Sequence, residues 1–144
     1  DLENVTDGIN NLKSIEDKEG WFISLENKGE KALAPPVVIF GVAYFTTFAP
    51  SSGSTEGIAR IYALDYKNGG PIIDLNAENN TEGIKIDLSD RSRIIGTGIP
   101  SGVVISAING KPVGYAGFQG GVYGTPLRGN STIIPIWWRE VSKK

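Results

Sequence analysis

The sequence predicts an all-β protein built mostly from antiparallel strands. Nineteen glycines and eight prolines among 144 residues favour a chain rich in turns. A predicted strand near the middle of the chain carries apolar residues on both of its faces. Ile61, Ala63 and Tyr66 would face one side of the sheet. Tyr62 and Leu64 would face the other. Such a strand is expected between two layers rather than half exposed to solvent.

The other predicted strands are short runs of apolar, β-branched and aromatic residues between turn signals. They cover residues 21–25, 30–33, 41–47, 71–75, 83–88, 103–108, 111–118 and 133–141. Pro35 and Pro36 are not expected in the middle of a hydrogen-bonded ladder, because proline has no backbone N–H to donate. Asn109 and Gly110 predict a tight hairpin turn between two of the strands.

One short helix is expected at the N-terminus, within residues 1–19. Ile9, Leu12 and Ile15 repeat there at a spacing of three, and a Thr-Asp pair precedes them as the N-cap. Gly8 weakens this helix, since glycine lowers helix propensity. The rest of the chain shows no internal boundary, so we expect a single β-rich domain over residues 1–144.

The composition excludes several classes of function. The chain has no histidine and no cysteine, which excludes a Ser-His-Asp triad, a thiol nucleophile and a His-ligated zinc site. A net charge of −2 gives no field that would attract nucleic acid or anionic lipid. No apolar run reaches the roughly 20 residues of a spanning helix. We therefore predict no enzymatic activity, no cofactor, no nucleic-acid partner and no membrane span. The absence of methionine indicates a processed product or a piece of a longer chain.

The central segment carries the pattern Gly-Val-x-Tyr, a gap, and then Tyr-Ala-Leu-Asp-x-x-x-Gly, in residues 41–44 and 62–69. This pattern resembles one blade of a quinoprotein-type β-propeller. The resemblance implies antiparallel blade-like sheets. A weaker similar unit begins at residue 102, and two units cannot close a ring, because the smallest propellers have four blades. The chain is thus expected to form an incomplete ring, as part of a larger propeller or assembly.

A longer series of motifs narrows the resemblance. It consists of GWFISL at residues 20–25, GEKALAPPVV at 29–38, GVAYFTTFAP at 41–50, YALD at 62–65 and WRE at 138–140. The series resembles the carboxy-terminal β-propeller region of the PilY family, which is associated with the tips of type IV pili. The resemblance implies an extracellular or cell-surface protein that assists pilus assembly, opposes pilus retraction and takes part in adhesion. Its partners would be pilin or other pilus subunits, the remainder of a propeller chain, or neighbouring copies in a filament.

The family's calcium loop has no good counterpart in this chain. Residues 74–80 have oxygen-bearing side chains at alternate positions, but they lack the central glycine, and Lys85 stands where a twelfth-position acid is needed. We therefore predict no metal site. Asn4, Asn79 and Asn130 each begin a glycosylation sequon.

Four aromatic residues are the candidate contacts with a partner protein or a glycan: Trp138, Tyr115, Phe118 and Tyr123. Indole and phenol rings can stack on sugars or fill an interface. The alternative is that Trp137 and Trp138 point to opposite faces of a strand and that the aromatic, glycine-rich run forms packed turns. The corresponding alternative functions are a surface polysaccharide-binding module and a globular subunit of an extracellular filament. A fragment of a quinoprotein enzyme is a third interpretation.

Overall fold

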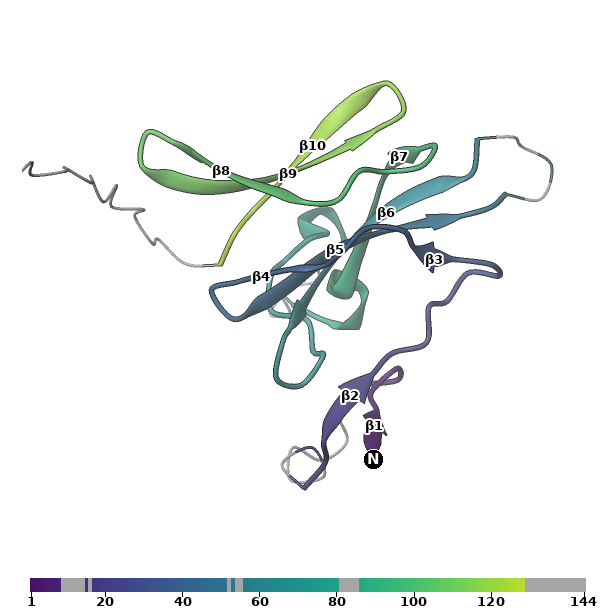
Figure 1. Ribbon diagram of the computed structural model, residues 1–144, viewed down its shortest axis with the longest axis vertical. Coiled ribbons are helices and arrows are strands. Elements are labelled where there is room, and N and C mark those ends of the chain that lie inside the picture. The colour runs from purple at the N-terminus through teal and green to yellow at the C-terminus, as the bar shows by residue number, and fades with distance from the viewer. Residues whose placement is uncertain (9–14, 16, 52, 54–55, 81–85, 129–144) are drawn as a thin grey trace, which may run out of the picture.

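The computed structural model describes residues 1–8, 15, 17–51, 53, 56–80 and 86–128 (Figure 1). These residues form an all-β protein with antiparallel main sheets, which confirms the predicted class. The strands are β1 (Leu2–Asn4), β2 (Gly20–Phe22), β3 (Lys31–Ala32), β4 (Val37–Ile39), β5 (Val42–Ala49), β6 (Ile58–Asp65), β7 (Ser92–Thr97), β8 (Val104–Ile108), β9 (Lys111–Phe118) and β10 (Gly121–Thr125). Two short 3-10 helices, η1 (Ala77–Asn79) and η2 (Leu88–Arg91), lie between β6 and β7.

The first sheet holds five strands in four positions, in the order β3-β5-β6-β7, with β4 also paired to β5. Both β3 and β4 lie on the same edge of β5, since Ala32 pairs with Thr47 and Val37 pairs with Tyr44. Residues 33–36 separate the two short strands and include the predicted proline pair. Proline cannot donate to a ladder, so this edge position is interrupted there, as expected. The result is a four-position antiparallel meander.

The second sheet is a three-stranded antiparallel meander in the order β10-β9-β8. Asn109 and Gly110 join β8 to β9, with φ values of 51° and 74°. Two consecutive residues with positive φ define the tight hairpin turn that the sequence predicted. β10 was not predicted, because its sequence is dense in glycine, yet all five of its residues pair with β9.

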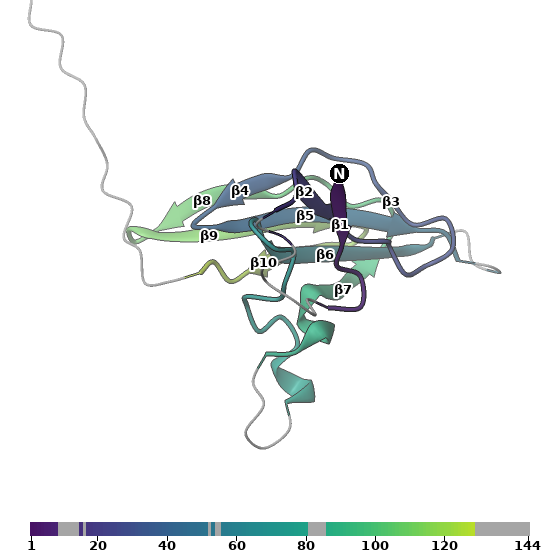
Figure 2. The same cartoon turned by 90° about the horizontal axis from the view of Figure 1, so that it is seen from below.

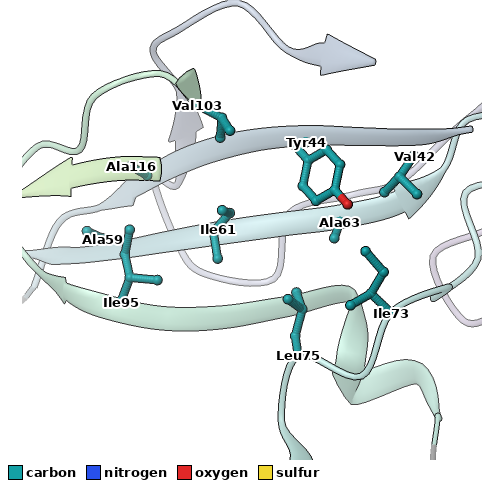
Figure 3. Packing of buried hydrophobic residues seen from close by; sticks show 10 residues of the cluster. All are labelled: Val42, Tyr44, Ala59, Ile61, Ala63, Ile73, Leu75, Ile95, Val103 and Ala116. Atoms are coloured by element: carbon teal, nitrogen blue, oxygen red, sulfur yellow. The ribbon is translucent and has the colours of Figure 1, made fainter. Parts of the chain in front are cut away.

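The first sheet is covered on both faces (Figures 1 and 2). On one face, Ile61 and Ala63 are fully buried in a cluster with residues of the second sheet such as Ala116 (Figure 3). On the other face, Tyr62 and Leu64 are also buried. The prediction of a strand between two layers is therefore confirmed. Tyr66 was expected in the core and is 49% exposed, because it lies just beyond the end of β6.

The second covering layer is the N-terminal ribbon, which we define as residues 1–6 and 20–24. It contains β1 and β2, which pair in parallel. Val5 is 1% exposed, and the indole Nε1 of Trp21 donates to the carbonyl of Tyr66 at 2.9 Å. Both side chains pack so closely on Gly69 that a Cβ there would lie 2.7 Å from the Trp21 ring. The ribbon is thus fixed on the turn that follows β6.

Four sequence predictions are corrected or left outside the description. The predicted strand at residues 83–88 has no counterpart, since residues 83–85 lie outside the described residues and Leu88 begins η2. No N-terminal helix is seen as an element of the described residues, in which residues 2–4 form β1. Ile15 alone is helical there, and Ile9 and Leu12 lie outside the described residues. The predicted strand at residues 71–75 is reduced to one isolated bridge from Pro71 to Leu64. The predicted last strand, residues 133–141, lies outside the described residues.

Candidate functional site

One face of the second sheet packs on the first sheet and the other is open to solvent. Opposite residues in an antiparallel pair share a face, and so do alternate residues of one strand. Val104 pairs with Tyr115, Ile108 with Lys111, and Val122 with Gly117, so their side chains share the open side. We call the apolar surface made by five of these residues the outer face: Val104, Ile108, Val113, Tyr115 and Val122.

The outer face is unusually exposed for its apolar character. Val122 is 69% exposed, Val104 is 63% exposed and Ile108 is 52% exposed. Lys111, at the end of β9, is the charged residue that shares this side of the sheet. Ser106 lies on the same side between Val104 and Ile108, opposite Val113. An exposed, largely apolar surface of this kind is typical of a contact with another protein layer.

The structure places three of the four predicted contact residues, and they lie on different sides of the second sheet. Tyr115 lies on the outer face. Phe118 and Tyr123 lie on the inner side, partly buried against the core cluster. The Phe118 ring fills the space above Gly96, where a Cβ would approach it to 2.2 Å. Trp138 lies outside the described residues. Phe118 and Tyr123 therefore join the two sheets, as packed rings rather than as a contact platform.

Tyr123 also contacts a charged side chain of the first sheet. The guanidinium carbon of Arg93 lies 6.0 Å from the centre of the Tyr123 ring, which is the geometry of a cation–π contact. Burial raises the pKa of the Tyr123 hydroxyl, and the nearby Arg93 charge partly opposes this shift. The ring is thus engaged with β7.

A polar cleft lies on the opposite face of the first sheet. Its volume is about 690 Å³, and residues from the N-terminal ribbon, β6, η2 and β7 line it. The lining includes three arginines, Arg60, Arg91 and Arg93, together with Asp7 and Glu26. The mixture of both charges with apolar side chains gives the cleft no strong preference for one sign of charge.

Arg91 connects two walls of this cleft. Its guanidinium donates to the carbonyls of Thr6 and Val5, both at 2.7 Å, and the residue is only 7% exposed. Burial lowers the pKa of Arg91, while the nearby carboxylates of Glu26 and Asp7 raise it. Arg91 therefore fastens the N-terminal ribbon to η2.

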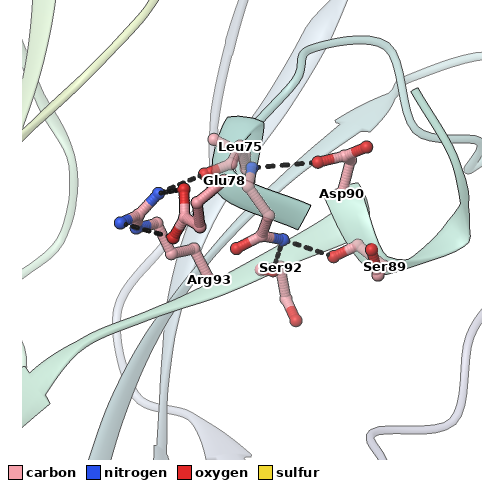
Figure 4. A network of polar contacts seen from close by, with 7 residues as sticks. Leu75, Glu78, Ser89, Asp90, Ser92 and Arg93 are labelled. Carbon is pink, nitrogen blue, oxygen red and sulfur yellow. Dashed lines mark hydrogen bonds and ion pairs between the residues drawn. The ribbon is translucent and has the colours of Figure 1, made fainter. Parts of the chain in front are cut away.

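A second polar network holds the segment that leads into η2 and β7 (Figure 4). Arg93 pairs with the carboxylate of Glu78 at 2.9 Å and donates to the carbonyl of Leu75. Asp90, 1% exposed, accepts from the backbone amides of Asn76 and Asp87. Asp87 and Asp90 form a capping box at η2. Hydrogen bonds and an ion pair within this segment hold these side chains, so Glu78 and Arg93, which line the cleft, have a structural role.

Glu30 is a buried carboxylate near the same face of the first sheet. One oxygen accepts from the Thr47 hydroxyl at 2.6 Å and from the Tyr62 hydroxyl at 2.9 Å. The other accepts from the Asn27 side chain at 2.6 Å and from its backbone amide at 3.2 Å. Burial raises the pKa of Glu30, but these hydrogen bonds outweigh it and the pKa lies below its usual value. Burial and the Glu30 charge raise the pKa of Tyr62.

The described residues contain no group of three or more acidic side chains arranged to hold a metal ion. Within the same part of the chain, no helix has the length and apolar character needed to span a membrane. The site residues that sequence reasoning missed are Val104, Ile108 and Val122. Their strands were predicted in part, but the shared face follows from the register between them. Comparison with known protein families, curated proteins and solved structures finds no match.

Proposed function

We propose that this chain is a structural and adhesive component of a bacterial type IV pilus system, similar to the carboxy-terminal propeller region of the PilY family. It acts at the cell surface through protein–protein contacts and catalyses no reaction. The observation that carries the proposal is the exposed apolar outer face of the second sheet, with Val104 and Val122 each more than half exposed. The motif series described above supports the family.

The arrangement of the sheets supports a propeller-like origin for this surface. Propeller blades are four-stranded antiparallel sheets that pack around a common axis. The first sheet is a four-position meander, and it packs face to face against the second meander. In an incomplete ring of such blades, the outer face would be the surface that meets the next blade or a partner subunit. This accounts for its apolar side chains.

The chemistry of the outer face fits a protein partner. Interface centres are depleted in charge and rich in aromatic and aliphatic side chains. Val104, Tyr115 and Val122 supply such a centre, and Lys111 lies at its margin. The candidate partners are pilin, another pilus subunit, the remainder of a propeller chain, or a neighbouring copy in a filament.

The test is a charge placed on the outer face. Val104→Lys and Val122→Lys should abolish surface piliation and adhesion when they replace the natural chain in the bacterium that encodes it. Burying an unpaired lysine in an interface costs free energy. In the isolated protein the same lysine stays in water, because Val104 and Val122 are both more than half exposed. Ile94→Lys is the matched control, because Ile94 is 53% exposed and lies on β7 of the first sheet. Folded Val104→Lys and Val122→Lys proteins with normal piliation would contradict the proposal.

The alternative function, binding of a surface polysaccharide, receives less support from the geometry. Of the aromatic residues between positions 115 and 123, Tyr115 lies on the outer face while Phe118 and Tyr123 pack inward. Sugar-binding platforms need exposed ring faces. A glycan array probed with the natural protein and with Tyr115→Ala separates the two functions. Glycan binding that is lost in Tyr115→Ala would favour the alternative.

A further inference from the structure

The sequence contains two Asn-Gly pairs, and the structure holds them differently. They are Asn68-Gly69, in the turn after β6, and Asn109-Gly110, in the turn between β8 and β9. In such a pair the asparagine side chain is open to attack by the next backbone nitrogen, because glycine has no side chain to obstruct it. Whether the attack occurs in the folded protein depends on how firmly the two residues are held.

The first pair is fixed in place by its neighbours. The amide of Gly69 donates to the carbonyl of Asp65 at 2.8 Å. The side-chain oxygen of Asn68 accepts from the amide of Gly70 at 2.9 Å. Gly69 is buried, and a Cβ built on it would lie 2.7 Å from the Trp21 ring. Attack by the Gly69 nitrogen would therefore require that this turn first give up two hydrogen bonds and its packing against the N-terminal ribbon.

The second pair lies at the free end of the β8–β9 hairpin (Figure 1). Within the described part of the chain, no hydrogen bond holds the amide of Gly110 or the side chain of Asn109. Asn109 is exposed, and so are the flanking residues Ile108 and Lys111. Rotating Asn109 until its side chain meets the Gly110 nitrogen therefore disturbs only the last pair of the hairpin, which is a small local opening.

We propose that Asn109 is a site of spontaneous deamidation in the folded protein and that Asn68 is not. The nitrogen of Gly110 attacks the side-chain carbonyl carbon of Asn109 and closes a succinimide ring. The bond from that carbon to the side-chain nitrogen breaks, and ammonia leaves with the amide proton of Gly110. Water then opens the ring at the side-chain carbonyl, which gives aspartate, or at the main-chain carbonyl, which gives isoaspartate.

The product would change one end of the outer face. Ile108 belongs to the outer face, and Lys111 shares its side of the sheet. Either product adds a carboxylate beside them. Isoaspartate also routes the main chain through the side-chain carbon, so the lengthened turn no longer matches the pairing of Ile108 with Lys111. The end of the hairpin should then loosen. The inference stands on the two turns alone, so it does not depend on the proposed pilus function.

Ageing of the purified natural protein in mildly alkaline buffer tests the site. Peptide mass spectrometry follows the gain of about 1 Da at each asparagine as NH₂ is replaced by OH. In the folded protein we expect deamidation at Asn109 to be at least about tenfold faster than at Asn68, with isoaspartate among the products. In urea the two rates should become similar, because both pairs are Asn-Gly.

Three results would overturn the proposal. The first is equal rates at the two sites in the folded protein, or a faster rate at Asn68. The second is deamidation at Asn109 that proceeds in urea but not in the folded protein, since the hairpin would then protect it. The third is aspartate at position 109 without isoaspartate, because ring opening gives both products.

Two variants separate the effect of charge from that of chain length. Asn109→Gly accepts the positive φ of the turn but has no side chain to react, so it should abolish the mass gain in this turn. Asn109→Asp adds the carboxylate without lengthening the main chain. Hydrogen exchange of the β8 amides, residues 104–108, should be faster in the isoaspartate product than in Asn109→Asp. Equal exchange in the two would overturn the proposed loosening.

Discussion

Glu30 shows how much one side chain contributes to this fold. Its four hydrogen bonds reach Thr47 on β5, Tyr62 on β6 and Asn27 in the preceding turn. Phe45 stacks on Tyr62 with ring centres 4.8 Å apart, so the position of that ring depends on the same carboxylate. A buried carboxylate that accepts several charge-assisted hydrogen bonds is strongly position-specific. Glu30 thus ties the first sheet to the loop that precedes it.

Replacing Glu30 by glutamine should destabilise the protein markedly. All four partner groups of Glu30 donate hydrogen bonds, and the NH₂ group of glutamine is also a donor. At least one buried hydrogen bond is therefore lost, at a cost of about 2–3 kcal/mol of unfolding free energy. Urea denaturation measures this difference. Glu26→Gln is the matched control, since Glu26 is exposed in the same loop, and it should change stability by less than about 0.5 kcal/mol. Equal stability of the two variants would show that the Glu30 hydrogen bonds contribute little.

The same variants have a defined pH dependence. The pKa of Glu30 is lowered on folding, because its hydrogen bonds outweigh the effect of burial. A lowered folded-state pKa gives stability that is present above the unfolded-state pKa and is lost as pH falls through the folded-state pKa. The stability difference between the natural protein and Glu30→Gln should therefore be constant near neutral pH and shrink in acid. A difference that grew on acidification would contradict this assignment.

At the scale of elements, the contact between the two sheets depends on a missing side chain. Gly96 on β7 lies beneath the Phe118 ring of β9, where a Cβ would approach to 2.2 Å. The β6–β7 pairing also shifts register at Ala59 and Arg60, directly opposite this position. Thr46 supplies a further link, since its hydroxyl donates to the Ser101 carbonyl at 2.7 Å. The two sheets can approach closely at this point because Gly96 on β7 has no side chain.

Gly96→Ala should therefore separate the sheets or displace the Phe118 ring. Overpacking of this kind costs roughly 1–3 kcal/mol, measured by thermal or urea unfolding. Gly124→Ala is the control, because its nearest neighbour, Tyr115, would be 3.7 Å from the new Cβ. Adding Phe118→Leu to Gly96→Ala should recover part of the loss, since the smaller side chain vacates the space. A double variant no more stable than Gly96→Ala would show that another contact is limiting.

At the scale of the whole molecule, three layers are held together by a few specific contacts (Figure 2). Arg91 joins the N-terminal ribbon to η2 through the carbonyls of Val5 and Thr6. Arg91→Met keeps the apolar stem but leaves these two carbonyls without their donor. Hydrogen exchange of residues 2–6 and 20–24 should become faster, while β5 and β6 keep their protection.

Arg93→Met is the control for this experiment. Arg93 lies two residues away and bonds to Glu78 and Leu75, outside the ribbon. Its removal should leave exchange in the ribbon unchanged. If the two variants affected the ribbon equally, Arg91 would not be its specific attachment.

The parts of the fold that sequence reasoning predicted correctly depend on local signals. The two apolar faces around Ile61, the break at Pro35 and Pro36, and the turn at Asn109 are each encoded by neighbouring residues. β7 was missed because it begins with polar residues and contains Gly96. That glycine is explained only by the Phe118 ring, which is distant in sequence.

The candidate site was predictable only in part, because it depends on register. Tyr115 and Phe118 belong to one aromatic run, but an odd spacing in an extended strand places them on opposite faces. Val104 and Val122 lie 18 positions apart and share one face of the sheet, because both strands pair with β9. Glu30 gave no local signal at all, since it lies among exposed charged residues and gains its partners from β5 and β6.

The attachment of the N-terminal ribbon has a consequence for how the protein would carry mechanical load. β5 and β6 are joined by eight opposed residue pairs along their full length. The ribbon is fastened to the layers beneath it by individual side chains, among them Trp21 and Arg91. A pull on Asp1 would therefore break these few anchors one after another and release the ribbon while the first sheet stays intact. Tension would in this way uncover Gly69 and the turn that follows β6, so the ribbon is the part of the described molecule best placed to respond to force.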